Sequence, residues 1–333
     1  MEKIAFISGG IFMYWSSIII GLAVLTAIAA FMALYLKKSG NAVGACLTVP
    51  LCIITSLVLS RLVHWYCRAD SYASFRVAMT DYSWGGYALM GIFGACILCA
   101  CALRLLRVVK NLPELLDCMA LAGGAGIAVG RLASFYNASD RGFLMDAGMG
   151  LPFAYTVTNP VSGLVETRLA TFLLQSIVTA VIVLLLLVWV ACAGARKKKI
   201  RDGDLCLLFL AAYGGSQIVF DSTRYDSLFM RSNGFISIVQ ILGAAALVLA
   251  IVLFSVRMVK HRGLKWYQFL IWPVMLALLG GAGYMEYHVQ RHGDQAVFAY
   301  SVMSACIVAE VVLILLVRCI GTAKRAGTAA AES

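Results

Sequence analysis

The sequence predicts an all-α protein, a polytopic bundle of transmembrane helices that crosses a membrane about nine times. Of its 333 residues, 62% are hydrophobic and 13% are charged, whereas soluble domains average about 45–50% and about 25%. The apolar residues also gather in nine runs, each near the roughly 20 residues that a spanning helix needs. No basic stripe lies on a soluble segment, so the net charge of +11 suits an anionic membrane leaflet and excludes a nucleic-acid partner.

The nine apolar runs are the expected spans. They cover residues 11–36, 43–63, 86–106, 115–136, 169–195, 204–221, 236–256, 266–285 and 297–317. The first run is too long for the apolar part of a signal peptide, and no A-x-A cleavage site follows it. We therefore expect the first run to stay in the protein as a helix.

Basic residues predict how the spans are oriented. The connections on one side of the membrane hold 17 of the 27 Lys and Arg residues, many of them in clusters such as Arg196–Lys199. Connections rich in Lys and Arg usually face the cytoplasm. We expect a multi-pass membrane protein with its N-terminus outside and its C-terminus in the cytoplasm.

Isolated arginines on the outer side stand out from these clusters. Arg61, Arg131 and Arg224 each lie at the end of an apolar run, where a charge is costly and is often functional. Arg131 also follows a glycine-rich stretch, 120-ALAGGAGIAVG-130. A thin helix there lets a lipid head group approach the guanidinium, although close packing against another helix explains the glycines equally well.

The order of several motifs resembles the bacterial prolipoprotein diacylglyceryl transferase family. The motifs are YWSSIIIGL at 14–22, SRLVHWY at 60–66, GGYALMGIFGA at 85–95, GRLASFYNASDRG at 130–142, AYGGSQIVFDSTR at 212–224 and SIVQIL at 237–242. The family signature G-R-x-x-N-F-x-N-x-E-x-x-G is matched at Gly130, Arg131, Phe135, Asn137 and Gly142. The resemblance implies a seven-helix transferase-like core over residues 1–260, in the inner membrane of a bacterium. Beyond this core, the apolar runs predict two additional transmembrane helices at 261–320, and the composition of 321–333 predicts a disordered cytoplasmic tail.

The resemblance implies a transferase that uses phosphatidylglycerol and a prolipoprotein as substrates. A diacylglyceryl group moves to the thiol of the lipobox cysteine next to the signal peptide, and glycerol 1-phosphate leaves. The candidate catalytic residues are Arg131, Asp140, Asp221 and Arg224, and the candidate substrate-binding residues are Arg61, Ser134, Asn137, Gly142, Tyr213 and Gln217. An arginine suits a phosphate because its planar guanidinium donates paired hydrogen bonds. We expect no cofactor and no metal.

Departures from the family pattern keep a second class of function open. Ser134 replaces an Asn, Ser139 replaces a Glu, Met90 replaces a His, and Gln217 replaces an Arg. Asp140 lies beside the position of the missing Glu, and Asp221, Asp140 or His64 are the candidate bases. The alternative to an active transferase is a catalytically degenerate or differently specific relative that binds an anionic lipid and a membrane protein partner.

Three further stretches carry expectations of their own. The connection 137–168 is rich in Gly and Pro, so we expect an irregular cap. The run CILCAC, with Cys96, Cys99 and Cys101, lacks partner ligands and favours buried thiols over a metal site. The stretch EYHVQRHGD has two His at helical spacing, which allows a metal site but favours a polar outer loop.

Overall fold

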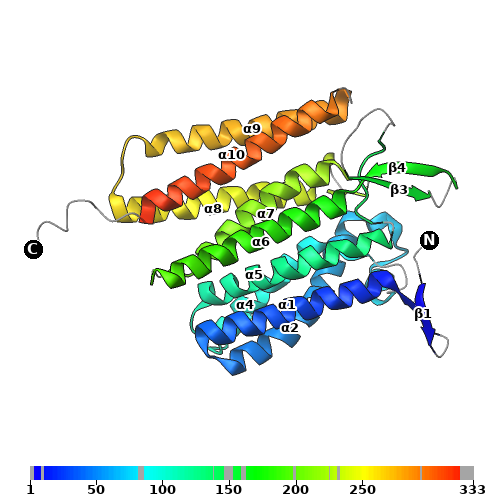
Figure 1. Ribbon diagram of the computed structural model, residues 1–333, viewed down its shortest axis with the longest axis horizontal. Helices are drawn as coiled ribbons and strands as arrows, with labels where there is room; N and C mark the ends of the chain where they lie inside the picture. Colours follow the sequence, from blue (N-terminus) through cyan, green and yellow to red (C-terminus); the bar gives the residue numbers. More distant parts are fainter. Residues whose placement is uncertain are drawn as a thin grey trace, which may run out of the picture. The chain divides into compact units, whose positions relative to one another are not determined.

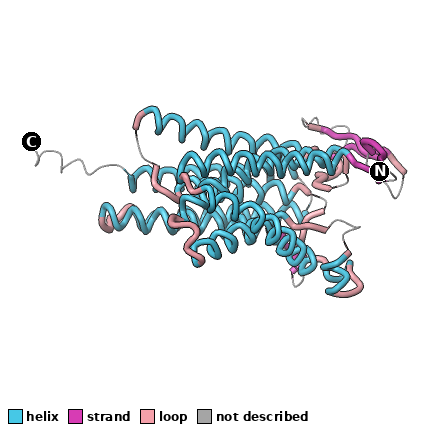
Figure 2. Tube along the Cα trace, turned by 90° about the horizontal axis from the view of Figure 1, so that it is seen from below, coloured by secondary structure: helices cyan, strands magenta, loops and turns pink. Residues whose placement is uncertain are grey.

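The computed structural model is built mainly of long helices (Figure 2). It describes residues 4–8, 11–81, 86–137, 139–145, 153–158, 163–197, 200–224, 226–230, 233–292 and 295–322. The chain divides into two compact units: the first holds 1–209 and 223–239, and the second holds 210–222 and 240–333. Part of α7 and most of α8 fall in the second unit together with the last two helices, and the domain division expected at residue 260 stays a prediction. The expected tail falls mostly on 323–333, outside the described residues.

The first unit carries six helices, two 3₁₀ turns and the start of a seventh helix. They are α1 (Trp15–Ser39), α2 (Ala42–Cys67), η1 (Ala69–Ser71), α3 (Phe75–Thr80), α4 (Leu89–Leu105), α5 (Leu112–Gly130), η2 (Arg131–Phe135), α6 (Thr171–Ala195) and the first residues of α7 (Asp204–Ser222). Helix α1 packs along α5, α2 packs along α4, and α5 also packs on α6 (Figure 1). Helix α5 is therefore in the middle of this unit, and Arg131, a candidate site residue, directly follows its last residue.

The second unit combines the remainder of α7 with α8 (Ile238–Arg262), α9 (Gln268–His292) and α10 (Ala296–Thr322). Small residues bring these helices close together: a Cβ on Gly243 would lie 2.4 Å from the carbonyl oxygen of Gly214, and one on Gly215 would lie 2.9 Å from Ile307. Helices in lipid gain most from such close van der Waals contact, since apolar burial supplies no net drive between them. Helix α10 thus packs on α7 and α8, and α9 packs on α10.

Eight of the described helices are long and apolar enough to cross a membrane. They match eight of the nine expected spans, and the remaining expected span at 86–106 corresponds to the apolar helix α4, which is 17 residues long. A 17-residue helix is about 25 Å long, somewhat less than a bilayer core of about 30 Å. The prediction of a polytopic, all-α membrane protein is confirmed.

The described residues form three antiparallel hairpins, all in the first unit. They pair β1 (Ile4–Ser8) with β2 (Ile11–Tyr14), β3 (Ala154–Thr158) with β4 (Val165–Leu169), and β5 (Phe229–Met230) with β6 (Asn233–Ser237). Figure 1 shows β1, β3 and β4 at one end of the helices.

Two of these hairpins correct the sequence-based expectations. The span expected to begin at residue 11 begins at Trp15, because Ile11–Tyr14 pairs with Ile4–Ser8. The cap expected to be irregular over 137–168 contains β3 and β4, which pair from Ala154 opposite Leu169 to Thr158 opposite Val165. Both segments are rich in aromatic and β-branched residues, which suit a pleated strand. The expectation of an irregular cap considered only the glycine and proline content.

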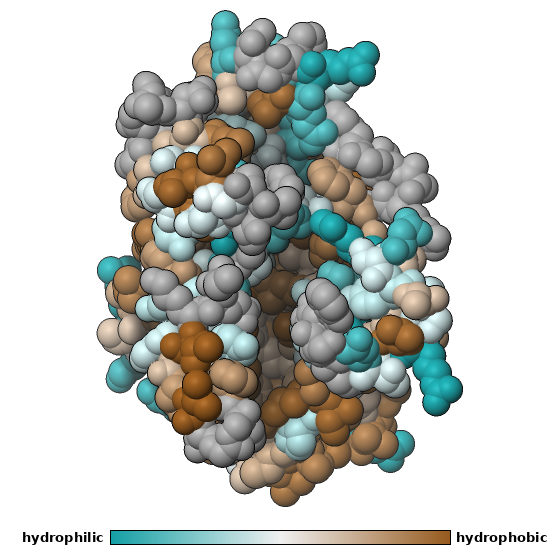
Figure 3. Space-filling model, turned by 90° about the vertical axis from the view of Figure 1, so that its right-hand side faces the viewer, coloured by the Kyte–Doolittle hydropathy of each residue, from teal (hydrophilic) through white to brown (hydrophobic). Residues whose placement is uncertain are grey.

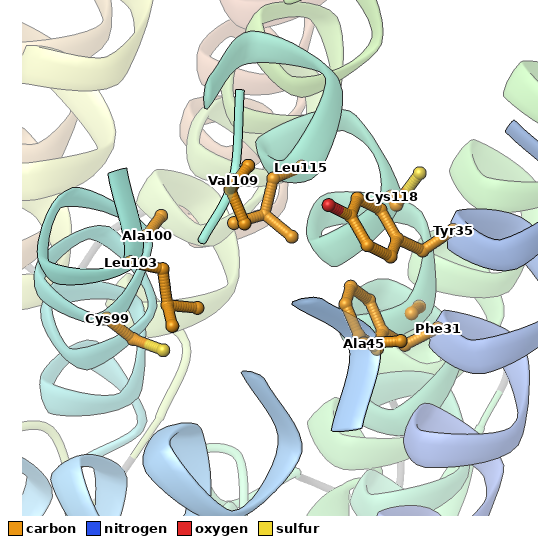
Figure 4. Close-up of a cluster of buried hydrophobic side chains, with 10 residues drawn as sticks. Phe31, Tyr35, Ala45, Cys99, Ala100, Leu103, Val109, Leu115 and Cys118 are labelled. Carbon is orange, nitrogen blue, oxygen red and sulfur yellow. The ribbon is translucent and has the colours of Figure 1, made fainter. Parts of the chain in front are cut away.

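Apolar side chains from α1, α2, α4 and α5 form a buried cluster in the first unit. The cluster contains Phe31, Tyr35, Ala45, Cys99, Ala100, Leu103, Val109, Leu115, Cys118 and Ala122. Val109, from the connection before α5, lies beside Leu115 of α5 (Figure 4). The rings of Phe31 and Tyr35 stack with centroids 5.4 Å apart. This packing holds α5 in position against three other helices.

An ion cluster near the N-terminal end of α5 connects this helix to α1 and α7. The buried carboxylate of Asp117 accepts hydrogen bonds from the backbone N–H groups of Gly203 and Cys206, both at 2.9 Å. These groups flank the start of α7, where the first helical N–H groups lack partners within the helix. Lys38 at the end of α1 lies 3.4 Å from Asp117 and 2.9 Å from Asp202. We call Lys38, Asp117 and Asp202 the inner cluster.

Candidate functional site

The signature stretch begins where α5 ends. Helix α5 stops at Gly130, and Arg131–Phe135 continues as the 3₁₀ turn η2. The preceding glycines mostly face other helices: a Cβ on Gly126 would lie 2.9 Å from Ala27 of α1, and one on Gly124 would lie 2.6 Å from Phe209. Close helix packing therefore accounts for these two glycines. Arg131 follows at the end of this tightly packed helix.

Asp140 brings together two of the three isolated arginines, Arg131 and Arg224. Its Oδ1 atom lies 2.7 Å from Nη1 of Arg131 and 2.7 Å from Nη2 of Arg224. These short distances are typical of charge-assisted hydrogen bonds. The sequence predicted all three residues as catalytic candidates, and the structure places them in direct contact although Arg224 is far from the other two in sequence. We call Arg131, Asp140, Arg224 and Asp226 the outer cluster.

Asp226 completes the outer cluster, and sequence reasoning did not identify it. Its Oδ1 accepts hydrogen bonds from both Nε and Nη2 of Arg224, each at 3.0 Å. Its Oδ2 accepts the backbone N–H of Asp140 at 3.0 Å. One carboxylate thus orients the guanidinium of Arg224 and holds the backbone that presents Asp140. The only sequence signal was an acidic residue two positions after a candidate arginine.

The backbone conformation of Asp140 explains how it reaches both arginines. Asp140 has a φ of +58°, in the left-handed region that non-glycine residues other than Asn and Asp seldom adopt. The family signature has its acidic residue one position earlier, where this chain has Ser139. The left-handed turn redirects the side chain of the shifted acid toward Arg131 and Arg224.

Gly142 is required by close contacts on both of its sides. Its N–H donates to the carbonyl of Leu169 at 3.0 Å, and its own carbonyl accepts from Nη1 of Arg168 at 3.2 Å. Gly142 also forms an isolated antiparallel bridge with Arg224. A Cβ atom here would lie 2.6 Å from Oγ1 of Thr171 and 2.7 Å from the Leu169 carbonyl. Only glycine lets the segment pass between β4 and Arg224.

Ser134 and Asn137 support the segment between the two arginines. The hydroxyl of Ser134 is buried and donates to Oδ2 of Asp140 at 3.2 Å. The side-chain oxygen of Asn137 accepts from the backbone N–H of Ser139 at 3.0 Å and from its hydroxyl at 2.6 Å. Asn137 therefore stabilises a local turn that leads into Asp140. Ser134 donates to the carboxylate oxygen of Asp140 that does not contact the arginines.

The surrounding groups keep the carboxylate of Asp140 ionised. Burial alone would raise its pKa, but the charges of Arg131 and Arg224 and hydrogen bonds from Arg131 and Ser134 outweigh burial and lower the pKa to about 2. A group with such a low pKa is a poor proton acceptor near neutral pH. These contacts favour an electrostatic role for Asp140 over that of a base, and its catalytic role stays a prediction.

The structure gives Arg61 a different set of partners. Arg61 is 1% exposed, and its Nε, Nη1 and Nη2 atoms donate to the carbonyls of Ala78, Gly86 and Asp81. Its guanidinium also lies over the rings of Tyr72 and Tyr87, at 5.3 and 5.5 Å from their centroids. These contacts anchor the connection between α2 and α4, and the expected lipid-binding role of Arg61 stays a prediction.

Three predicted residues lie on α7 in the second unit. Tyr213 and Gln217 are each 1% exposed and Asp221 is 2% exposed. The carbonyl of Tyr213 accepts the Ser216 hydroxyl at 2.7 Å, and Nε2 of Gln217 donates to that hydroxyl at 3.4 Å. These positions are buried along one helix, and their lipid-binding and catalytic roles stay predictions.

The other polar candidates have local partners. Nδ1 of His64 lies 2.8 Å from the hydroxyl of Tyr72, in the region that Arg61 anchors. All eleven cysteines are free thiols. Within the described residues, no three His, Cys, Asp or Glu side chains form a group that could hold a metal ion. The stretch EYHVQRHGD falls partly outside these residues, because 293–294 are not described.

Fold and site together define a multi-pass membrane protein with paired arginines at one end of its central helix. Residues 3–256 match the family model of prolipoprotein diacylglyceryl transferase, so the chain belongs to this family. Its relatives include proteins named phosphatidylglycerol–prolipoprotein diacylglyceryl transferase. The relative from Streptococcus equi subsp. zooepidemicus is 26% identical over 276 residues, which cover 80% of this chain and 99% of the relative. The relative from Finegoldia magna is 26% identical over 260 residues, which cover 76% and 94%.

Proposed function

We propose that this protein transfers the diacylglyceryl group of phosphatidylglycerol to the lipobox cysteine of a prolipoprotein. Family membership over residues 3–256 supports this activity. The observation that carries the proposal is the convergence of Arg131 and Arg224 on one point, 2.7 Å from each guanidinium. Two guanidinium groups aimed at a shared oxygen position suit the phosphate of an anionic lipid.

The arginine pair fits the charge that develops during this reaction. The cysteine sulfur forms a bond to the glycerol carbon, the bond from that carbon to the phosphate oxygen breaks, and the thiol proton is released. Glycerol 1-phosphate leaves with the bonding electrons and gains negative charge on its oxygens. The phosphate of the bound lipid carries one negative charge, so preorganised cations at that place stabilise the transition state, where further charge develops, more than the ground state. Arg131 and Arg224 would therefore bind the lipid phosphate and stabilise the leaving group.

Arg224 can supply the charge that Gln217 lacks. The family has an arginine where this chain has Gln217, and Arg224 follows seven residues later. In the structure Arg224 lies just beyond the end of α7 at Ser222 and is held beside Arg131 by Asp140. The second arginine of the site is thus present, but it comes from the segment that follows the helix. Asp221 stays a candidate base for the cysteine thiol.

We propose that this site faces the outside of the cell. The connections rich in Lys and Arg, including the segment at the inner cluster, then face the cytoplasm. Secreted prolipoproteins and outer-leaflet phosphatidylglycerol would reach the outer cluster from the same side. A cytoplasmic reporter fused after Ser333 should be active in this orientation, whereas an active periplasmic reporter there would contradict it.

A reconstituted assay tests the activity. The full-length protein, in vesicles of phosphatidylglycerol, should attach a diacylglyceryl group to a peptide that carries a signal segment and a lipobox cysteine, as seen by mass spectrometry. Arg224→Ala should lose the activity, because it removes one of the two phosphate-binding cations. Arg76→Ala is the matched control, since Arg76 is an exposed arginine on α3. A peptide whose cysteine is replaced by serine should remain unmodified.

A negative result would favour the alternative function. If the wild-type protein binds phosphatidylglycerol but modifies no peptide, the transferase proposal is wrong. A lipid-holding relative that binds a membrane protein partner would then explain the retained arginine pair. If Arg224→Ala retains full activity, the arginine pair is not the phosphate site.

A further inference from the structure

The position shared by the two arginines is occupied by the protein itself. Oδ1 of Asp140 lies 2.7 Å from a guanidinium nitrogen of Arg131 and 2.7 Å from one of Arg224. A phosphate oxygen bound by two arginines would adopt the same distances, because both are oxyanions that accept charge-assisted hydrogen bonds. Asp140 and a bound phosphate therefore compete for one position.

The charges of the outer cluster lead to the same conclusion. Two guanidinium groups face two carboxylates, Asp140 and Asp226. The side chains of Arg131, Asp140 and Arg224 are only 10%, 14% and 13% exposed, so water screens an unbalanced charge poorly. A phosphate added beside Asp140 would leave a net negative charge, whereas a phosphate that replaces Asp140 would keep the charges balanced.

Asp226 allows the exchange without loss of the arginine geometry. It binds Nε and Nη2 of Arg224 and the backbone N–H of Asp140. These contacts do not depend on the side chain of Asp140. If that side chain rotates away, Arg224 stays oriented and the left-handed backbone at Asp140 stays held.

We propose that Asp140 is an internal occupant of the anion site and that the phosphate of the incoming lipid displaces its carboxylate from Arg131 and Arg224. The inference rests on the proposed function for the identity of the phosphate source, a lipid head group. Before lipid binds, Asp140 keeps the two cations close together and shields them from other anions. Displacement makes binding selective, because an anion must bind both guanidinium groups better than the built-in carboxylate does.

Removal of the competing charge tests this exchange. The full-length protein in neutral detergent is titrated with glycerol 1-phosphate and, separately, with inorganic phosphate, and the affinity is taken from the shift of the thermal unfolding midpoint. Asp140→Asn should bind glycerol 1-phosphate roughly tenfold more tightly than the wild type, which corresponds to about 1.4 kcal/mol. Asn also tolerates the left-handed conformation. Asp202→Asn, the same charge change in the inner cluster, should leave the affinity unchanged.

A second variant, Asp140→Gly, keeps the test valid if Asp140→Asn does not fold. Glycine adopts a φ of +58° without strain, so this variant removes the charge and keeps the turn. Unchanged or weaker anion affinity in both Asp140 variants would overturn the proposal, because a competitor would then not have been removed. Equal gains in Asp202→Asn would also overturn it, since the effect would follow net charge alone.

Two further measurements, lipid binding in micelles and peptide lipidation, test this inference independently of the proposed function and identify the phosphate source. Mixed micelles of detergent and phosphatidylglycerol should stabilise Asp140→Asn more than the wild type. A gain with inorganic phosphate but none with the lipid would contradict the displacement by lipid. If the wild type lipidates peptide and Asp140→Asn shows no affinity gain, only the exchange is wrong. If Asp140→Asn gains affinity and no peptide is lipidated, only the transferase proposal is wrong.

Discussion

Helix α5 carries an ion cluster near each of its ends, and the two clusters are built differently. In the inner cluster, Asp117 is 1% exposed and accepts two backbone N–H groups at the start of α7. In the outer cluster, Asp140 contacts the guanidinium groups of two side chains, Arg131 and Arg224. Backbone donors cannot move away without opening a helix, whereas side-chain donors can exchange one oxyanion for another. The inner cluster is suited to hold helices together, and the outer cluster is suited to bind a ligand.

Figure 3 shows hydrophilic and hydrophobic residues side by side on the face of the molecule that it displays. The apolar residues beside the outer cluster include Phe135, which is 37% exposed and packs edge-on against Phe172 at 4.6 Å between ring centroids. The hydroxyl of Tyr155 on β3 donates to the carbonyl of Phe135 at 2.9 Å. Aromatic and polar groups at a membrane boundary suit a ligand that has acyl chains and a charged head group.

The largest expected effect is on activity at the outer cluster. Arg131→Ala should reduce the turnover of a lipobox peptide by about 10²–10³, or roughly 2.7–4 kcal/mol, because one preorganised cation is lost from the leaving phosphate. Arg131→Lys should also be impaired, since an ammonium lacks the planar guanidinium. Steady-state kinetics measures the loss, and the unfolding midpoint checks that the variants fold. Full activity in Arg131→Ala would show that the outer cluster is structural, like the inner one.

The second effect is on stability at the inner cluster. Asp117→Ala should lower the free energy of unfolding by about 3 kcal/mol, because it leaves two buried N–H groups and Lys38 without their shared carboxylate. Unfolding in increasing denaturant measures the change. The activity per folded molecule should stay close to that of the wild type. A variant that is stable but inactive would instead show that Asp117 takes part in the reaction. The two clusters would then not differ in role.

A third, smaller effect comes from the backbone that joins the outer cluster to the strands. Gly142→Ala should destabilise the protein by about 1–3 kcal/mol, because the new methyl group meets Thr171 and the Leu169 carbonyl at less than 3 Å. Gly123→Ala on α5 is the matched control, since its Cβ meets nothing within 4 Å. That control should be neutral or slightly stabilising. Equal unfolding midpoints for both variants would mean that the Gly142 segment relaxes freely.

The smallest expected effect is that of pH on the outer cluster. Asp140 has a pKa lowered to about 2, so its contribution to stability is present above the ordinary pKa of an aspartate and is lost as pH falls toward 2. From pH 5 to pH 8 the group does not titrate. The dependence of turnover on pH in that window should therefore be the same in Asp140→Asn as in the wild type. A limb of the pH profile that disappears in Asp140→Asn would show that Asp140 acts as an acid or a base.

Local sequence patterns were sufficient for the membrane spans and for the family. Apolar runs of about 20 residues form helices because unpaired backbone groups are too costly in lipid, and this holds whatever lies next to them. The same reasoning overextended the first helix into Ile11–Tyr14, since an apolar run of four residues suits a strand as well as a helix. The signature at Gly130–Gly142 indicated Arg131, Asn137 and Gly142 by position in the motif alone.

The sequence by itself determined that this is a helical membrane protein with isolated arginines on one side and a transferase signature between them. Only the tertiary structure decided which of those arginines act together. Arg61 is held by the backbone carbonyls of its own connection, whereas Arg131 and Arg224 meet at Asp140. The contact between Asp140 and Asp226 spans 86 residues of chain, and no local pattern reports a pairing over that separation. The contact depends on where the end of α5, the left-handed turn at Asp140 and the segment from Arg224 to Asp226 lie in space, because ion pairs are set by distances in space and not along the chain.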